Sequence, residues 1–260
     1  MLQGLVSAFR TLTIFALPGR ESADCTAALP FFPVVGCVLG LLLWLMSLSN
    51  ALVNCNGWPA GVAALMLLAS VVGTGALHLD GLADLADALG GGWNRERRLE
   101  IMKDSHLGTF GAVALIVVLL CKWLAFSRLV IAGSTFWVVL VLMVSRAMLV
   151  DLTVRLPYAR SEAGTAGALV HGASARHRLA ARAFTAVVAV VVYGPLGLGA
   201  LVAAHSLTWL FGNWCLRTLG GITGDLLGAG NELVETTLLL LTAAPGSAIM
   251  VYTGWGWLFP

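Results

Sequence analysis

Long apolar stretches alternate with short polar stretches along the chain. Because a helix of about 20 apolar residues spans a bilayer, this pattern predicts an all-α, polytopic membrane helical bundle of about seven spans. The expected spans are residues 31–53, 58–79, 109–132, 134–156, 180–193, 196–216 and 226–244. The pair Gly194-Pro195 separates the fifth span from the sixth. Ahead of the spans, residues 1–30 are expected to form an interfacial segment, since Arg10 interrupts the apolar run there.

Composition supports the same class. Hydrophobic residues make up 59% of the 260-residue chain and charged residues 11%, with a mean hydropathy of +0.91. We therefore expect one integral membrane domain over residues 1–260, with the lipid bilayer as its surroundings. The net charge of +2 gives no reason to expect a nucleic-acid partner. Gly36 and Gly40 are four residues apart, a spacing that permits close helix packing and would also permit a homo-oligomer.

The charged residues predict the orientation. With the loops 80–109 and 157–179 on the cytoplasmic side, all but three of the 15 Lys and Arg residues fall on or near that side. The exceptions, Lys122, Arg128 and Arg146, lie inside expected spans. Positive residues favour the cytoplasmic side, so the N-terminus is expected there as well. The 13 acidic residues gather on or near the same face, which indicates that the chemistry is cytoplasmic.

A short acidic stretch follows the second expected span. Asp80, Asp84 and Asp87 have the spacing i, i+4, i+7, so on a helix they fall within an arc of about 60°. Three carboxylates on one face repel one another unless a cation lies between them. Hard oxygen ligands favour Mg²⁺ or Mn²⁺ over zinc. We interpret this face as a cation site; the alternative is an ordinary solvated helix face.

Two further polar segments belong with the aspartates. Lys103-Asp104-Ser105 precedes the turn Gly108-Thr109-Phe110-Gly111, and a turn of this kind at a helix N-terminus often presents N–H groups to phosphate. The segment 217–235 contains Arg217, Thr223, Asp225, Glu232 and Glu235. Asp225 and Glu232 are seven residues apart and share a helix face, with Glu235 about 60° further round. Carboxylates on this segment and on the acidic stretch 80–87, with basic residues between them, are typical of sites where divalent cations hold a diphosphate for phosphoryl transfer.

These motifs resemble those of the cobalamin synthase (adenosylcobinamide-GDP ribazoletransferase) family. The resemblance rests on HLDGLAD (78–84), IMKDS (101–105), GTFG (108–111) and RTLGGITGDLLGAGNELVE (217–235), with FFPVVGCVLG (31–40), Lys122, Ser145-Arg146 and Tyr158-Ala159-Arg160 in family order. It implies a multi-pass enzyme of the cell (inner) membrane that is Mg²⁺-dependent and transfers a substituted phosphate group. Its substrates would be the corrinoid nucleotide adenosylcobinamide-GDP and α-ribazole or α-ribazole 5′-phosphate, and GMP would be released.

The roles that we expect combine this resemblance with the residue patterns. Metal ligands are expected to be Asp80, Asp84, Asp87, Asp225 and Glu232. Catalytic roles are expected for Lys103, Asp104 and Asp225, where a carboxylate would be a further ligand or a base for the attacking hydroxyl. Substrate or phosphate contacts are expected from Ser105, Arg146, Arg160, Arg217 and Thr223.

Two other functions use clustered acids. A CDP-alcohol-type phospholipid phosphotransferase would show an Ala-Arg pair after Asp-Gly, whereas here Asp80-Gly81 is followed by Ala83-Asp84. An ion-coupled transporter usually holds its acids near the bilayer midplane between inverted repeats, and no such repeat is visible in this sequence.

Overall fold

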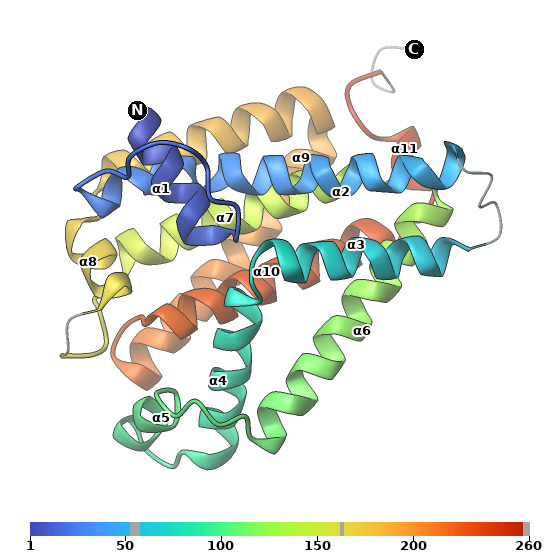
Figure 1. The fold of residues 1–260 in the computed structure, drawn as a ribbon. Coiled ribbons are helices and arrows are strands. Elements are labelled where there is room, and N and C mark those ends of the chain that lie inside the picture. Colours follow the sequence, from blue (N-terminus) through green and yellow to red (C-terminus); the bar gives the residue numbers. More distant parts are fainter. Residues whose placement is uncertain (53–57, 162–163, 257–260) are drawn as a thin grey trace.

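The structure is a computed structural model that describes residues 1–52, 58–161 and 164–256. These residues form helices and no named strand (Figure 1). In chain order the elements are α1 (Leu2–Leu12), the 3-10 helix η1 (Cys25–Phe31), α2 (Phe32–Leu52), α3 (Pro59–Gly73), α4 (Leu77–Gly91), α5 (Arg95–Ile101), α6 (Thr109–Ile131), α7 (Trp137–Arg155), α8 (Thr165–Gly172), α9 (Ala175–Leu219), α10 (Gly224–Ala243) and α11 (Ala248–Val251).

Helix α7 lies at the centre of the bundle. Every residue from Trp137 to Thr153 is buried, as expected for a helix that is apolar on all sides. It packs against α2, α9 and α10. Gly36 and Gly40 of α2 touch α7 so closely that an added Cβ would lie 2.2 Å from the oxygen of Leu142 and 2.5 Å from the Cα of Val139. This small-residue pair is therefore used inside the chain, and a homo-oligomer stays a prediction.

Four helices are long and apolar enough to cross a membrane within the described part of the chain. They are Cys25–Leu48, Thr109–Ile131, Trp137–Arg155 and Ala175–Leu219. The last is two helices joined by a kink, because Gly194 has φ 65° and ψ −148°. Both halves contact Asp151 of α7, through Arg182 and His205, so they fold back on one another as a hairpin. The predicted division at Gly194-Pro195 is confirmed, whereas the full count of seven spans is not.

The second expected span, 58–79, is wrong in its extent. Pro59 begins α3 at a position where a missing N–H costs little, but the helix ends at Gly73. The chain then turns through Gly75 and Ala76, which have φ of 58° and 56°. Helix α4 leaves at 86° to α3, and the pair passes the length and apolarity test for a span only when taken together. The aspartates thus lie on a separate helix.

The other boundaries agree more closely with the sequence pattern. Helix α6 (Thr109–Ile131) corresponds to the expected span 109–132, and α7 (Trp137–Arg155) corresponds to 134–156. Helix α10 replaces 226–244 but is not among the four candidate spans, and most of its residues are buried. The expected loops 80–109 and 157–179 contain α4, α5 and α8. The expected end of the first span at residue 53 and the polar turn after it lie outside the described residues.

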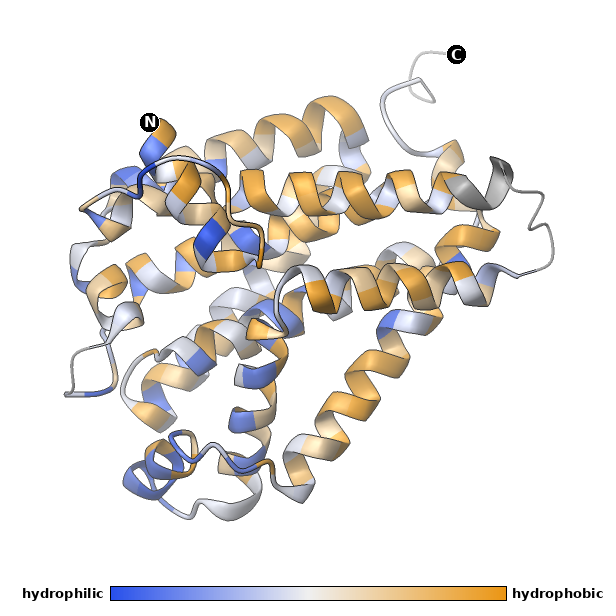
Figure 2. Cartoon of the chain, in the orientation of Figure 1, coloured by the Kyte–Doolittle hydropathy of each residue, from blue (hydrophilic) through white to orange (hydrophobic). Residues whose placement is uncertain are grey.

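Polar residues gather at one end of the bundle. Figure 2 shows hydrophilic residues on α4 and α5, whereas α2, α3 and α6 are mostly hydrophobic. Asn94 begins α5 as its cap, accepting a hydrogen bond from the N–H of Arg97. Helix α4 packs against α6 and α10, so the acidic stretch lies where the polar ends of these helices meet.

Candidate active site

Helix α4 presents Asp80 and Asp84 on one face, as their spacing predicts. Asp80 is exposed and Asp84 is half-buried. Gly81, between them, lies against α10, where an added Cβ would be 2.4 Å from the carbonyl oxygen of Asp225 and 2.8 Å from its Cα. Only a residue without a side chain permits this approach. Asp225 of α10 is thereby brought beside the aspartates of α4.

Asp87, the third aspartate of the face, caps the N-terminus of helix α6 with its side chain. Its two carboxylate oxygens accept hydrogen bonds from the backbone N–H of Gly108 at 2.8 Å and of Gly111 at 2.9 Å. An anion at a helix N-terminus is favoured by the helix dipole. The expectation that these two N–H groups are available to phosphate is therefore wrong, because Asp87 already occupies them.

A short backbone pairing places Arg160 opposite Asp225. Tyr158 and Ile222 form an isolated parallel bridge, in which the N–H of Ile222 donates to Pro157 at 2.8 Å and the N–H of Ala159 donates to Ile222 at 2.9 Å. Arg160 Nη2 then donates to Asp225 Oδ2 at 2.7 Å. The pairing needs a glycine at 221, since a Cβ there would lie 2.2 Å from the oxygen of Pro157. The glycine-rich turn predicted at 217–225 thus has a defined function in the fold.

These groups face a cavity of about 610 Å³. Asp80, Asp225 and Arg160 line it together with three side chains that the sequence analysis did not place among the substrate or metal contacts, Arg10, His78 and Tyr158. His78 and Tyr158 each lie two positions before a predicted site residue, Asp80 and Arg160 respectively. This proximity in the sequence is the signal that could have identified them. Arg160 Nε is buried without a hydrogen-bond partner among the described residues.

The electrostatics of the cluster indicate crowded carboxylates. Burial raises the pKa of Asp84 to about 7, and repulsion by Asp80 and Asp225 adds to the rise. Burial also raises the pKa of Asp225, against the opposing effect of the Arg160 guanidinium. The described residues contain no group of three His, Cys, Asp or Glu side chains already arranged to hold a metal ion. The cluster is therefore close together but not preorganised.

The turn after α5 is separate from this cavity. Lys103, Asp104 and Ser105 are exposed, and Asp104 accepts hydrogen bonds from the backbone N–H of His106 at 3.0 Å and from its ring Nδ1, 2.5 Å away. The side-chain hydrogen bond from His106 lowers the pKa of Asp104. Lys103 lines a neighbouring hollow of about 430 Å³ together with Arg160. Asp104 and Ser105 line neither cavity.

Two other expected contact residues do not line the cavity, although the Thr223 hydroxyl donates to Asp225 Oδ2 at 3.4 Å. Thr223 is buried and caps α10, its hydroxyl accepting from the N–H of Leu226 at 3.2 Å. Arg217 is exposed on the last turn of α9. The roles that the sequence assigned to these two residues stay predictions.

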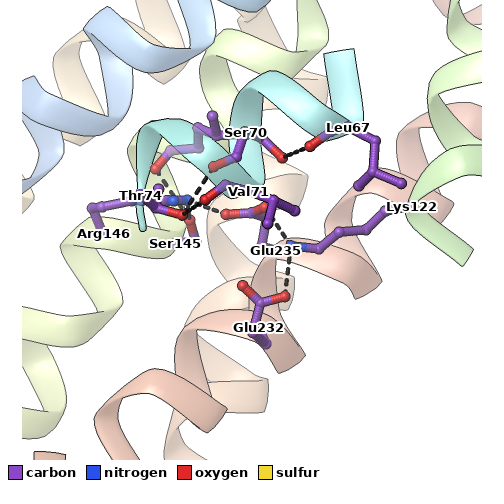
Figure 3. A network of polar contacts seen from close by, with 10 residues as sticks. Leu67, Ser70, Val71, Thr74, Lys122, Ser145, Arg146, Glu232 and Glu235 are labelled. Atoms are coloured by element: carbon purple, nitrogen blue, oxygen red, sulfur yellow. Dashed lines mark hydrogen bonds and ion pairs between the residues drawn. The ribbon is translucent and has the colours of Figure 1, made fainter. Parts of the chain in front are cut away.

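Arg146 and Glu232 belong to a second, buried polar network (Figure 3). Lys122 of α6 reaches between two glutamates of α10, with Nζ 2.5 Å from Glu232 Oε2 and 2.7 Å from Glu235 Oε1. The other oxygen of Glu235 is paired with Arg146 of α7, whose Nη1 also donates to Ser145 at 2.9 Å. Two cations thus meet two carboxylates deep between three helices. The structure does not bring Glu232 or Arg146 to the Asp80–Asp225 cavity.

Comparison with known proteins gives the family. The family model described as cobalamin-5-phosphate synthase matches residues 4–243. A protein of Chlorobaculum parvum is 43% identical over 94% of this chain and 96% of its own length. One from Syntrophobacter fumaroxidans is 43% identical over 92% and 96%, and one from Chlorobium phaeovibrioides is 39% identical over 97% and 100%. All three are named adenosylcobinamide-GDP ribazoletransferase. No solved structure matches the chain.

The match extends over nearly the whole chain and includes both carboxylate-bearing segments. It does not favour the phospholipid phosphotransferase or the transporter that the sequence analysis considered. The resemblance found in the motifs is confirmed, and the chain belongs to the cobalamin-5-phosphate synthase family.

Proposed function

We propose that this chain is an adenosylcobinamide-GDP ribazoletransferase. It joins adenosylcobinamide-GDP to α-ribazole or α-ribazole 5′-phosphate and releases GMP. Family membership and the names of its relatives support this assignment. The observation that carries it is the Arg160–Asp225 pair facing Asp80 across a cavity of about 610 Å³, because phosphoryl transfer requires mainly a positioned cation set and a group that accepts a proton.

The proposed location is the cell (inner) membrane, with the N-terminus and the cavity on the cytoplasmic side. The four apolar helices support membrane insertion, and the gathering of Lys and Arg near one face supports the orientation. The seven proposed spans are α2, α3, α6, α7, the two halves of α9 counted separately, and α10. In this arrangement α4 and the aspartates lie at the membrane surface.

The carboxylates of Asp80 and Asp225, which line the cavity, and of Asp84 close to them fit Mg²⁺. Asp80, Asp84 and Asp225 offer only carboxylate oxygens, which are the ligands that Mg²⁺ prefers. The pKa of Asp84 is raised mainly by burial and further by repulsion from Asp80 and Asp225, and a bound cation would oppose both effects. Asp80 and Asp84 would hold the ion, Asp225 beside them would act as the base, and Asp87, engaged with α6, would keep α4 in position. When bound, Mg²⁺ would neutralise charge on the diphosphate oxygens.

Arg160 and Asp225 would exchange partners during the reaction. The Arg160 guanidinium is paired with Asp225 at 2.7 Å and has an Nε without a partner among the described residues. A diphosphate offers Arg160 a bidentate partner of higher charge than a carboxylate. When the guanidinium turns to the diphosphate, Asp225 loses the cation that holds its pKa down and becomes a better acceptor for the ribazole hydroxyl proton. Lys103, in the adjoining hollow, would neutralise charge on the guanosine diphosphate side.

The test is GMP release by the purified full-length protein from adenosylcobinamide-GDP, α-ribazole and Mg²⁺. Asp84→Asn and Asp225→Asn should each lower turnover by at least about 100-fold, which corresponds to about 3 kcal/mol of transition-state stabilisation. Arg97→Gln is the control, because Arg97 forms an exposed pair with Glu100 and lines neither the cavity nor the hollow beside it. No GMP release by the wild-type protein would exclude the proposed function. Normal turnover in Asp84→Asn and Asp225→Asn together with loss in Asp104→Asn would move the chemistry to the turn after α5.

A further inference from the structure

A second cavity, of about 560 Å³, lies between α7 and the two halves of α9. Three arginines line it, one from α7 and two from the first half of α9: Arg155, Arg178 and Arg182. His205 and Trp209 come from the second half. None of these residues lines the Asp80–Asp225 cavity, so the two cavities are distinct.

Buried and backbone acceptors fix two of the guanidinium groups. Asp151, which is 5% exposed, accepts hydrogen bonds from Arg182 Nε and Nη2 at 2.8 Å each. Arg155 Nη2 donates to the carbonyl oxygen of Trp209 at 3.0 Å and to Asn213 at 3.2 Å. Each arginine keeps further N–H groups for a ligand, since a guanidinium carries five.

The third guanidinium is unpaired within the described part of the chain. The side chain of Arg178 makes no hydrogen bond or ion pair with the residues that the structure describes, yet it is half-buried and faces this cavity. Three guanidinium groups meet one carboxylate, that of Asp151, so the cavity carries excess positive charge. Guanidinium groups bind phosphate through paired hydrogen bonds, and the ligand chemistry that fits is therefore an oxyanion such as a phosphate.

The surroundings of the cavity are apolar. Trp209 and Leu210 at its rim are each 58% exposed, and along the same half of α9 Val202 and Leu198 are 59% and 53% exposed. Leu198, Val202 and Trp209 are spaced i, i+4, i+11 and form one helix stripe leading away from the arginines. A soluble phosphate would not contact this apolar stripe, whereas a phospholipid has both a phosphate for the arginines and an acyl chain for the stripe. Basic pockets between membrane helices at the cytoplasmic side bind such headgroups.

We propose that this cavity binds the phosphate headgroup of an anionic phospholipid, with an acyl chain along the Leu198–Val202–Trp209 stripe. The proposal rests on the membrane insertion proposed above but not on the transferase activity. The arginines would bind the headgroup at the membrane surface, close to the loop that carries Arg160. Bound lipid would then hold the end of α7 against both halves of α9.

The experiment uses the full-length protein in nanodiscs of phosphatidylcholine with a minor fraction of phosphatidylglycerol. Native mass spectrometry measures the phosphatidylglycerol retained after release from the nanodisc. Arg178→Gln should lower retention about tenfold, the effect of losing one hydrogen bond to a charged group. Arg176→Gln is the matched control, because Arg176 is two residues away, exposed and outside the cavity. Ser206→Glu, at the exposed rim, should also lower retention by placing a negative charge beside the headgroup.

Two results would overturn the proposal. One is retention of phosphatidylglycerol by Arg178→Gln and Ser206→Glu at the level of Arg176→Gln. The other is an equal rise in Tm when inorganic phosphate replaces phosphatidylglycerol in detergent solution, which would identify a soluble anion as the ligand. GMP release is not the readout, so failure of the transferase assay leaves this test unaffected, and failure to enter nanodiscs would instead refute the membrane insertion on which it rests.

Discussion

The buried network around Lys122 makes the sharpest prediction, through the variant Glu235→Gln. Glu235 gives one carboxylate oxygen to Lys122 and the other to Arg146, whereas Glu232 forms an ion pair with Lys122 alone among the described residues. The side chains of all four residues are at most 4% exposed. The two positive and two negative charges therefore sum to zero at a site that solvent hardly reaches.

The magnitude follows from what each variant leaves behind. Removing one partner of a buried ion pair costs about 3–5 kcal/mol, because the other charge stays buried without compensation. Glu235→Gln leaves Lys122 and Arg146 with one carboxylate between them, and Arg146 loses the carboxylate that it contacts. Glu232→Gln leaves Lys122 paired with Glu235, so its cost should be that of one charged hydrogen bond, about 1.5–3 kcal/mol.

Thermal unfolding of the purified protein in detergent measures the difference. At about 2–4 °C for each kcal/mol, Glu235→Gln should lower Tm by about 10 °C and Glu232→Gln by roughly half as much. The double variant Lys122→Met/Glu232→Gln removes one charge of each sign and should unfold at a higher temperature than the summed single effects predict. A larger shift for Glu232→Gln than for Glu235→Gln, or strict additivity in the double variant, would refute the charge balance.

Three further predictions concern the site and the topology. Because a proton competes with Mg²⁺ for Asp84, whose pKa is raised to about 7, isothermal titration should show Mg²⁺ affinity rising with pH through pH 7 and becoming flat above it; a pH-independent affinity would exclude Asp84 as a ligand. Gly81→Ala should abolish GMP release, since its Cβ would lie 2.4 Å from the α10 backbone, whereas Gly199→Ala, whose Cβ meets nothing within 4 Å, should stay active. Reporter fusions after Gly133 and Gly194 should be external and fusions within α5 cytoplasmic, and a cytoplasmic signal at Gly133 would contradict the seven-span arrangement.

The sequence predicts those features that depend on local periodicity. Asp80 and Asp84 share a face because helix geometry alone determines it, and Gly194-Pro195 breaks α9 because a helix cannot pass through that pair unchanged. The bend between α3 and α4 could not be predicted in the same way. The run 58–79 has no proline after residue 59, and its signal for a turn is only Gly73-Thr74-Gly75. Glycines are common in membrane helices, so this signal does not distinguish a bend from one continuous helix.

Other features depend on contacts between distant segments. Asp87 has the same helix phase as Asp80 and Asp84, and only the position of α6 shows that it caps Gly108 and Gly111. Glu232 has the phase of Asp225 but lies about 10 Å further along the helix, at 1.5 Å per residue. At that depth it meets Lys122 instead of the cavity. Phase on a helix can be read from spacing, whereas depth in a bundle cannot.

The bend at Ala76 also affects how the chain is synthesised. Helix α4 is synthesised well before α10, against which it packs. A straight continuation of α3 would carry unpaired aspartates toward the hydrocarbon layer during that interval, at a high free-energy cost. In the proposed orientation, the 86° turn instead keeps α4 outside the hydrocarbon layer until α10 has been made. The bend at Ala76 would therefore allow the early helices to insert before the candidate site is complete.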